Sequence, residues 1–334
     1  MNIVHQYDRT RLIVLFVFFC KMFNSNVIKR KSNFLRNLIL LFVTIVFIFF
    51  LFIVIRKVYI SKTSGTVSRN QVVNGWKKFD YQEVYNLTEK LLLKNPLNNF
   101  ALVYHGYACF FLALSKLDST EAQNFLDESI NSLRIALHDT QGSTRSQIEY
   151  ILGKAYFYKN TVSSYYYSDL AINYLEAARE HGYKADDIAE YLGLSYAVLN
   201  MPMESISAFT EALIVRESFS LLLSIAEQYY KTNQGNVAKQ YLFRIVNNCN
   251  DDNLVNKSQN LLALIYIDEG NYSEARETFS SILKKNQNSA DAYYGLGVIY
   301  EKQGDLVKAR AEWRKALKVH VNHAGALNKL SQYN

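Results

Sequence analysis

The sequence predicts an all-α protein in which a single N-terminal transmembrane helix precedes an α-solenoid of about seven helical hairpins and a C-terminal capping helix. Three observations support this fold class. An apolar run occupies Leu38–Ile55, and large and small apolar residues alternate at helical spacing over Ala290–His323. The second pattern recurs upstream with a period of about 34 residues. Because one hairpin cannot bury its own apolar face, the recurring units must stack.

Residues 1–33 form a basic N-terminal segment. Its apolar stretch, Leu12–Phe19, is too short to cross a bilayer and lacks the small residues of a cleavage site. We hypothesise that Met22 is the true start of the protein, because the residues from Met22 onward form the short basic stretch that usually precedes a signal-anchor helix. Recovery of a peptide from residues 1–21 by mass spectrometry would reject this hypothesis.

The apolar run predicts a transmembrane signal-anchor helix over residues 34–57. Leu38–Ile55 contains Thr44 as its only polar residue. At 1.5 Å per residue the run covers about 27 Å, which is close to the thickness of a hydrocarbon core. Its composition favours insertion by about 5 to 10 kcal/mol. The membrane contact is therefore expected at Leu38–Ile55.

The basic residues of the chain are concentrated around this span. Residues 1–57 contain nine Lys and Arg against the single acid Asp8, whereas the remainder has 28 basic and 29 acidic residues. A nearly neutral remainder argues against a nucleic-acid partner. A short basic N-terminus favours a cytoplasmic N-terminus and an extracytoplasmic C-terminal domain, periplasmic in a bacterium. The charge bias across the span is small, so the opposite orientation stays open.

After a short linker at residues 58–64, the helical pattern divides residues 65–323 into seven hairpins. The predicted hairpins cover residues 65–98, 99–145, 146–185, 186–218, 219–255, 256–289 and 290–323. The first is degenerate and ends near Pro96, which cannot continue a helix. The second and third carry extra residues between their helices, at Leu112–Ala122 and Asn160–Tyr167. Residues 324–334 repeat only the first helix of a hairpin, which is typical of a cap.

The seventh hairpin shows the pattern most fully, with two helices around the turn Gln303–Asp305. Small residues at Gly297, Ala309 and Ala316 allow the two helix axes to approach within about 8–10 Å, while Trp313 fills the adjacent groove. The same small positions recur in the hairpins before it. These are Gly106 and Ala136, Gly153 and Ala171, Gly193 and Ala212, Ala226 and Ala238, and Ala263 and Ala275.

These residues resemble the tetratricopeptide repeat (TPR) family, and the resemblance covers about 270 residues. It implies a concave wall formed by the first helix of each hairpin, where a protein or peptide partner binds. The positions that it places on this wall are Tyr104, Tyr107, Tyr150, Lys154, Glu190, Tyr191, Leu194, Glu227, Asn260, Tyr294 and Val298. Tyrosine suits a polypeptide ligand because it combines area with a polar tip. The alternative interpretation, weighed equally, is that several of these tyrosines pack between adjacent hairpins and do not bind a ligand.

The two insertions fall on the same edge of the predicted solenoid. Insertions on one edge often form a contact surface, so Tyr165, Tyr166 and Tyr167 are candidate anchors for a partner. Extension of the helices or mutual packing of the insertions is the alternative.

No pattern in the sequence indicates catalysis, a cofactor, a metal site or a small-molecule substrate. The histidines are dispersed, and His320 and His323 fall at a helix end where solvated polar residues are normal. Cys20, Cys109 and Cys249 have no metal-ligand spacing, and Cys109 is interpreted as a small core residue.

The sequence therefore predicts a non-enzymatic, membrane-anchored scaffold for protein–protein interactions. If its solenoid faces outward, it resembles envelope proteins that assist assembly, secretion or folding of other envelope proteins. A cytoplasm-facing adaptor that recruits soluble machinery and a holdase-type chaperone remain the alternatives.

Overall fold

The computed structural model describes residues 33–63 and 67–333, with side chains over 41–56 and 67–333. The chain divides into two compact units, Met1–Thr66 and Val67–Asn334. The first unit contains α2, a single helix over Asn33–Thr63. Apart from Asn33, the predicted basic segment, including the hypothesis about Met22, lies outside the described residues.

Helix α2 is longer than the predicted span of residues 34–57, and residues 58–63 of the predicted linker continue it. Its large apolar side chains between Leu41 and Ile55 are 38–68% exposed. Side chains before residue 41, where the predicted apolar run begins, lie outside the described ones. Counting described residues alone, no helix combines the length and apolar character that a membrane crossing requires.

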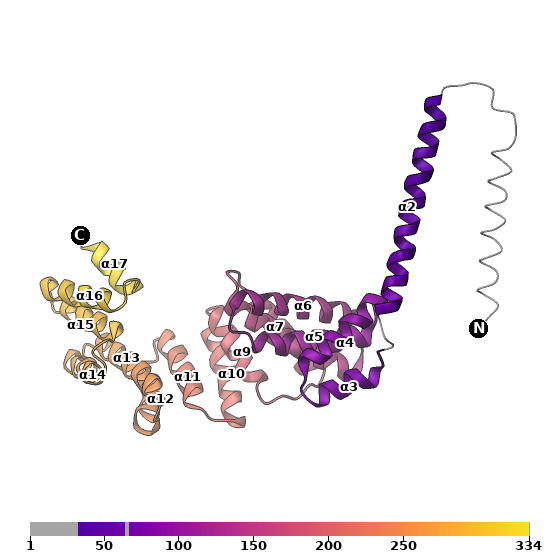
Figure 1. Cartoon of the computed structure of the whole chain (residues 1–334). Coiled ribbons are helices and arrows are strands. Elements are labelled where there is room, and N and C mark those ends of the chain that lie inside the picture. Colours follow the sequence, from indigo (N-terminus) through magenta and orange to yellow (C-terminus); the bar gives the residue numbers. More distant parts are fainter. Residues whose placement is uncertain (1–32, 64–66, 334) are drawn as a thin grey trace, which may run out of the picture. The chain divides into compact units, whose positions relative to one another are not determined.

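The second unit consists of seven helical hairpins and one further helix, which follow one another in sequence order (Figure 1). The hairpins are α3 (Arg69–Lys77) with α4 (Tyr81–Lys94), α5 (Asn99–Leu114) with α6 (Ser119–His138), α7 (Gly142–Val162) with α8 (Ser168–Glu180), α9 (Ile188–Val198) with α10 (Pro202–Val215), α11 (Phe219–Lys231) with α12 (Gly235–Asn248), α13 (Asp252–Asp268) with α14 (Tyr272–Lys285), and α15 (Ala290–Lys302) with α16 (Leu306–Val319). Helix α17 (Ala324–Gln332) follows them.

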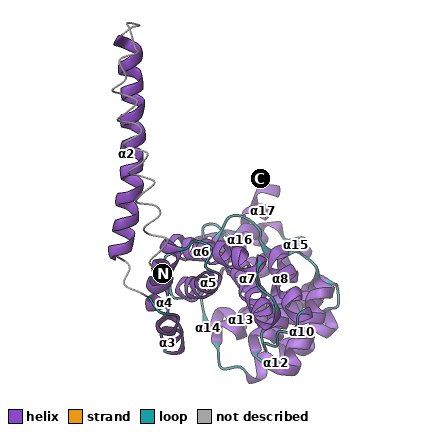
Figure 2. Cartoon of the chain, turned by 90° about the vertical axis from the view of Figure 1, so that its right-hand side faces the viewer, coloured by secondary structure: helices purple, strands orange, loops and turns teal. Residues whose placement is uncertain are grey.

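Each of these helices packs mainly on its neighbours in the sequence, and short loops join them (Figure 2). The described residues contain helices and no strands. The predicted all-α solenoid is therefore confirmed for Val67–Tyr333.

Five of the seven hairpins turn through one residue in the left-handed backbone region. These residues are Phe79, Asn200, Asn233, Gly270 and Gly304, with φ between 56° and 82°. A left-handed residue after the first helix ends it and reverses the chain within a few residues. The second and third hairpins have no such residue between their helices, and these are the two that carry insertions.

Glycine brings the two helices of a hairpin into contact, as the sequence predicts for Gly297. A Cβ atom on Gly297 would lie 2.3 Å from the indole nitrogen of Trp313, which is fully buried. In the fourth hairpin a Cβ on Gly193 would lie 2.4 Å from the ring of Phe209. The larger side chain of the second helix therefore occupies the space that glycine leaves in the first.

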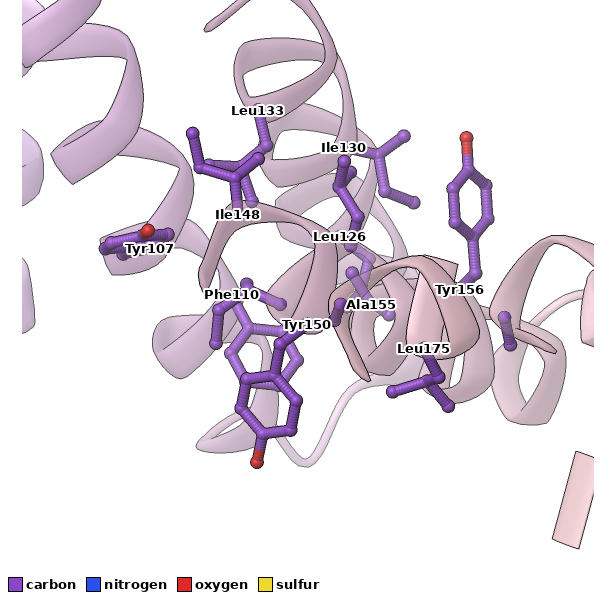
Figure 3. Close-up of a cluster of buried hydrophobic side chains, with 14 of the residues drawn as sticks. Tyr107, Phe110, Leu126, Ile130, Leu133, Ile148, Tyr150, Ala155, Tyr156 and Leu175 are labelled. Atoms are coloured by element: carbon purple, nitrogen blue, oxygen red, sulfur yellow. The ribbon is translucent and has the colours of Figure 1, made fainter. Parts of the chain in front are cut away.

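The largest apolar cluster runs continuously through the second, third and fourth hairpins. Figure 3 shows its centre, where Phe110, Leu126 and Leu133 of the second hairpin meet Ile148 and Leu175 of the third. Burial of each such aliphatic or aromatic side chain stabilises the fold by about 1.5–3 kcal/mol. This shared core fixes the third hairpin against its neighbours.

Most of the first insertion forms helix instead of loop. Helix α5 continues to Leu114 and α6 begins at Ser119, so only residues 115–118 connect them. In the third hairpin α7 continues to Val162, and residues 163–167 form the connection. Helix extension, one of the two alternatives for the insertions, therefore holds for most of the first insertion but only for residues 160–162 of the second.

Helix α17 covers the apolar side of the last hairpin, where Ala326 joins the buried cluster of Ala309, Trp313 and Ala316. His323 does not fit the expectation of a solvated residue. Its Nδ1 accepts a hydrogen bond from the backbone N–H of Ala326 at 3.1 Å, and its Nε2 lies 3.0 Å from Asp291. The histidine is the N-cap of α17, which explains why it is partly buried.

Candidate functional site

A pocket of about 710 Å³ lies between the third and fourth hairpins. It is lined by Tyr150, Phe157, Tyr158, Ala185, Asp186, Asp187, Glu190, Tyr191, Leu194, Ala212, Val215 and Arg216. Four of these residues, Tyr150, Glu190, Tyr191 and Leu194, are among the predicted concave positions. The volume falls in the range typical of ligand pockets.

Helical periodicity explains why these side chains converge. Tyr150, Phe157 and Tyr158 lie seven and eight residues apart on α7, which places them on one face. Asp187, the N-cap of α9, is followed by Glu190, Tyr191 and Leu194 at the same kind of spacing. The first helices of the third and fourth hairpins, α7 and α9, therefore line the same pocket with these side chains.

The carboxylate of Asp187 binds two other side chains at the pocket, those of Tyr150 and Lys154. The Tyr150 hydroxyl donates to its two carboxylate oxygens at 2.7 and 2.9 Å. Lys154 Nζ donates to Asp187 Oδ2 at 2.8 Å, and also lies 5.1 Å from the ring centroid of Tyr150 and 4.6 Å from that of Tyr191. The ammonium group of Lys154 is thus held by the carboxylate of Asp187 and by the faces of two aromatic rings.

The hydroxyls of Tyr150 and Tyr191 remain protonated at neutral pH. Burial, and then the hydrogen bond to Asp187, raises the pKa of Tyr150. Burial and the hydrogen bond to the Tyr158 hydroxyl, at an oxygen–oxygen distance of 2.7 Å, raise the pKa of Tyr191. Neither hydroxyl is therefore available as a phenolate nucleophile or base.

The rim of the pocket carries charge of both signs. Arg216 donates to Glu190 at 3.2 Å. Asp186 is exposed and has no hydrogen-bond or ion-pair partner among the described residues. The aromatic walls can therefore pack against an apolar or aromatic group, while the rim offers a free carboxylate and an exposed guanidinium.

The remaining predicted concave residues lie outside this pocket. Tyr107 is 4% exposed and packs against Trp76, with ring centroids 5.7 Å apart, so the packing alternative holds for it. Tyr104 is half-buried and also contacts Trp76. Asn260, Tyr294 and Val298 are half-buried on the sixth and seventh hairpins.

Glu227 is solvent-exposed on α11. Desolvation nevertheless raises the pKa of its carboxyl group, against the opposing effect of Lys231 and Lys257. The Glu227 side chain is therefore accessible to water, but enough protein atoms lie around its carboxyl group to desolvate it partly.

The three tyrosines at the insertion edge have different surroundings. Tyr165 and Tyr166 are exposed in the α7–α8 connection. Tyr167 is half-buried, and Lys159 Nζ lies 4.5 Å from its ring centroid. Only the first two are free to contact a partner.

Sequence analysis missed Phe157, Tyr158, Asp187 and Arg216. The helical spacing from Tyr150 was sufficient to find Phe157 and Tyr158, because residues seven and eight apart share a helix face. Asp187 is the N-cap of α9 by position, but its side chain makes no capping hydrogen bond and binds Tyr150 and Lys154 instead. Arg216 follows α10 and reaches the pocket only through tertiary packing.

Comparison with known proteins supports the solenoid fold. The profile of the C-terminal ARM domain of tetratricopeptide repeat protein 21 matches residues 171–328. The C-terminal part of a TPR repeat-containing protein from Cytophaga hutchinsonii is 14% identical, with a TM-score of 0.52 and coverage of 77% of this chain and 97% of that one. A comparison with curated protein sequences finds no significant match.

Two further solved structures are similar at lower scores. A tetratricopeptide repeat protein from Parabacteroides merdae is 18% identical, with a TM-score of 0.48 and coverage of 78% of this chain and 95% of that one. YrrB, described as a TPR protein with an unusual peptide-binding site, is 22% identical, with a TM-score of 0.43 and coverage of 56% and 92%. The stacked hairpins and the similarity to the Cytophaga hutchinsonii structure define an α-solenoid with a TPR-like fold.

Proposed function

We propose that the protein is a membrane-anchored scaffold that binds a protein partner through the pocket between its third and fourth hairpins. The observation that carries this proposal is the pocket itself, in which aromatic walls and rim charges combine. Aromatic side chains provide contact area at low entropic cost, and the rim charges select the orientation of a bound chain. Stacked hairpins bind extended or helical polypeptides in this manner.

The membrane anchor in this proposal is Leu38–Ile55. Its support is the sequence of the run, the length of α2, and the exposure of its described apolar side chains. Exposed apolar surface of this extent requires another apolar phase or a partner. Arg36, Arg56 and Lys57 flank the run and suit the lipid headgroups.

In the favoured orientation the N-terminus is cytoplasmic and the solenoid is extracytoplasmic, where it assists assembly, secretion or folding of envelope proteins. Paired C-terminal reporters test this orientation, one active only outside the cytoplasm and one fluorescent only inside. Activity of the outside reporter supports the proposal. Fluorescence of the inside reporter replaces it with a cytoplasm-facing adaptor.

Site-specific photo-crosslinking tests the pocket as the binding surface. A photoreactive phenylalanine derivative replaces Tyr158, which lines the pocket, or Tyr166, which is exposed at the insertion edge. We expect discrete protein adducts from position 158 and none from position 166. Adducts from position 166 alone would move the contact surface to the insertion edge.

A holdase would show a different pattern in the same chain. It would suppress aggregation of an unfolded model protein and yield many weak adducts at both positions. Arg216→Ala distinguishes the two functions, because a specific partner that uses the rim loses adduct yield, whereas a holdase that uses apolar surface does not.

A further inference from the structure

A second group of chemically active side chains lies away from the pocket, where the first hairpin meets the second. His105 and Cys109 are four residues apart on α5, and Glu128 lies opposite them on α6. One ligand-type atom from each residue lies within 4.8 Å of the others. His105 is 3% exposed and Cys109 is fully buried, whereas the Glu128 side chain is 41% exposed.

Hydrogen bonding to Thr88 determines which imidazole nitrogen carries a proton. Thr88 Oγ1 lies 2.7 Å from the carbonyl oxygen of Val84 and 3.0 Å from that of Tyr85, so its single proton is donated to the backbone. The same oxygen lies 2.9 Å from His105 Nδ1. It must accept there, and Nδ1 must therefore be the protonated nitrogen.

This tautomer leaves the lone pair of His105 Nε2 directed at Glu128. Nε2 lies 2.9 Å from Glu128 Oε1, which is also an acceptor when ionised. Two acceptors at this distance repel each other unless a proton, on the imidazole or on the carboxyl group, or a metal cation lies between them. A cation could also be bound by the third group, the Cys109 sulfur.

With a proton alone, the Cys109 thiol is left as a weak hydrogen-bond donor to Glu128, whereas a cation would bind all three groups directly. Imidazole, thiolate and carboxylate together form a ligand set that zinc prefers. The Nδ1–H to Thr88 hydrogen bond is the orienting contact that metal-bound histidines usually make. A bound cation would displace the proton of the Cys109 thiol, because thiolate is the form that coordinates a metal.

We propose that His105 Nε2, Cys109 Sγ and Glu128 form a binding site for a zinc-class divalent cation that joins α5 to α6. A water molecule reaches the fourth position from the exposed side of Glu128. Because Thr88 lies on α4, the site also couples the first hairpin to the second. This proposal is independent of the pocket and of the membrane anchor.

The test uses the full chain, purified in detergent, stripped with a chelator and dialysed against Zn²⁺. We expect one equivalent of bound zinc by elemental analysis. Co²⁺ in place of zinc should produce a thiolate charge-transfer band in the near ultraviolet, which reports the sulfur bond directly. The variants are His105→Gln, Cys109→Ala and Glu128→Gln, and Cys249→Ala is the matched control because it removes the other described cysteine.

His105→Gln and Cys109→Ala should weaken zinc binding by about 100-fold or more, and Cys109→Ala should abolish the charge-transfer band. Cys249→Ala should retain both the zinc and the band. Glu128→Gln alters a side chain that is partly exposed, so it retains the fold and tests the site if the buried variants do not fold. Absence of stoichiometric zinc in the wild type, or unchanged binding in a folded His105, Cys109 or Glu128 variant, would overturn the proposal.

Discussion

Single residues at the turns determine how tightly each hairpin closes. Gly304 adopts a φ of 82° without steric cost, whereas Phe79 occupies the equivalent place in the first hairpin with a φ of 59°. A phenylalanine in this region is uncommon, because its Cβ approaches the following carbonyl oxygen. Its ring is 75% exposed, so packing compensates for little of this strain.

Separate substitutions of these two turn residues should have opposite effects on the stability of the protein. We expect Phe79→Gly to stabilise the protein by about 0.5–1 kcal/mol, because glycine removes the left-handed strain. Gly304→Ala should destabilise it by about 1 kcal/mol for the same reason. Thermal unfolding of both variants measures the difference, and a lower melting temperature for Phe79→Gly would contradict this account.

Glycine at a helix contact has a different role from glycine at a turn. Gly297→Ala should destabilise the protein by about 1–3 kcal/mol, which is more than Gly304→Ala, because the new Cβ would lie 2.3–2.4 Å from the Trp313 ring. Space around Gly304 is open, so that variant is the control for backbone strain alone. Chemical denaturation compares the two, and equal losses would show that the helices separate freely.

At the scale of an element, α17 shows how a short helix is held in place. Glu301 on α15 accepts hydrogen bonds from Lys329 at 2.8 Å and from the Tyr333 hydroxyl at 2.6 Å. Burial alone would raise the pKa of Glu301, but the hydrogen bonds from Lys329 and Tyr333 outweigh it and lower the pKa below the usual 4.5. The charged carboxylate therefore stabilises the docked helix.

Acidification should release α17 selectively. The contribution of Glu301 is fully present above its ordinary pKa of 4.5 and is lost as the pH falls through the lowered value of the folded state. Hydrogen exchange of residues 324–332, corrected for the intrinsic pH dependence of amide exchange, should rise over that interval. Glu301→Gln should raise exchange already at neutral pH and remove this transition.

Glu269→Gln is the matched control for this experiment, since Glu269 binds Lys239 and makes no contact with α17. It should leave exchange of residues 324–332 unchanged. A wild-type-like pH transition in Glu301→Gln would assign the release of α17 to another group.

At the scale of the whole solenoid, each hairpin contacts mainly its neighbours, so destabilisation should remain local. Leu175 is fully buried in the third hairpin. Leu175→Ala should cost about 2–5 kcal/mol and increase hydrogen exchange in α6 to α9, while α15 and α16 keep their protection. A uniform increase over residues 67–333 would show that the unit unfolds as a single cooperative body instead.

The seven hairpins were predictable because their periodicity is local. Helical spacing, the small residues at positions such as Gly193 and the polar turn residues are all visible within about 34 residues. The resemblance to tetratricopeptide repeats, which rests on this local pattern, placed Tyr150, Glu190, Tyr191 and Leu194 on the concave wall. It could not separate Tyr150, which lines a pocket, from Tyr107, which is buried against Trp76, because both carry the same residue type on the same kind of helix.

The sequence by itself therefore determined the succession of hairpins, the close contacts at glycine, and the apolar run that we propose as a membrane anchor. Tertiary structure alone decided which side chains of different helices meet, within a hairpin and across hairpins. Arg216 reaches Glu190, Asp187 binds Tyr150 and Lys154, and Glu128 faces His105 and Cys109. These contacts join residues 19 to 37 positions apart, and their geometry depends on how packed helices, within a hairpin and between successive hairpins, rotate against each other, which no local spacing specifies.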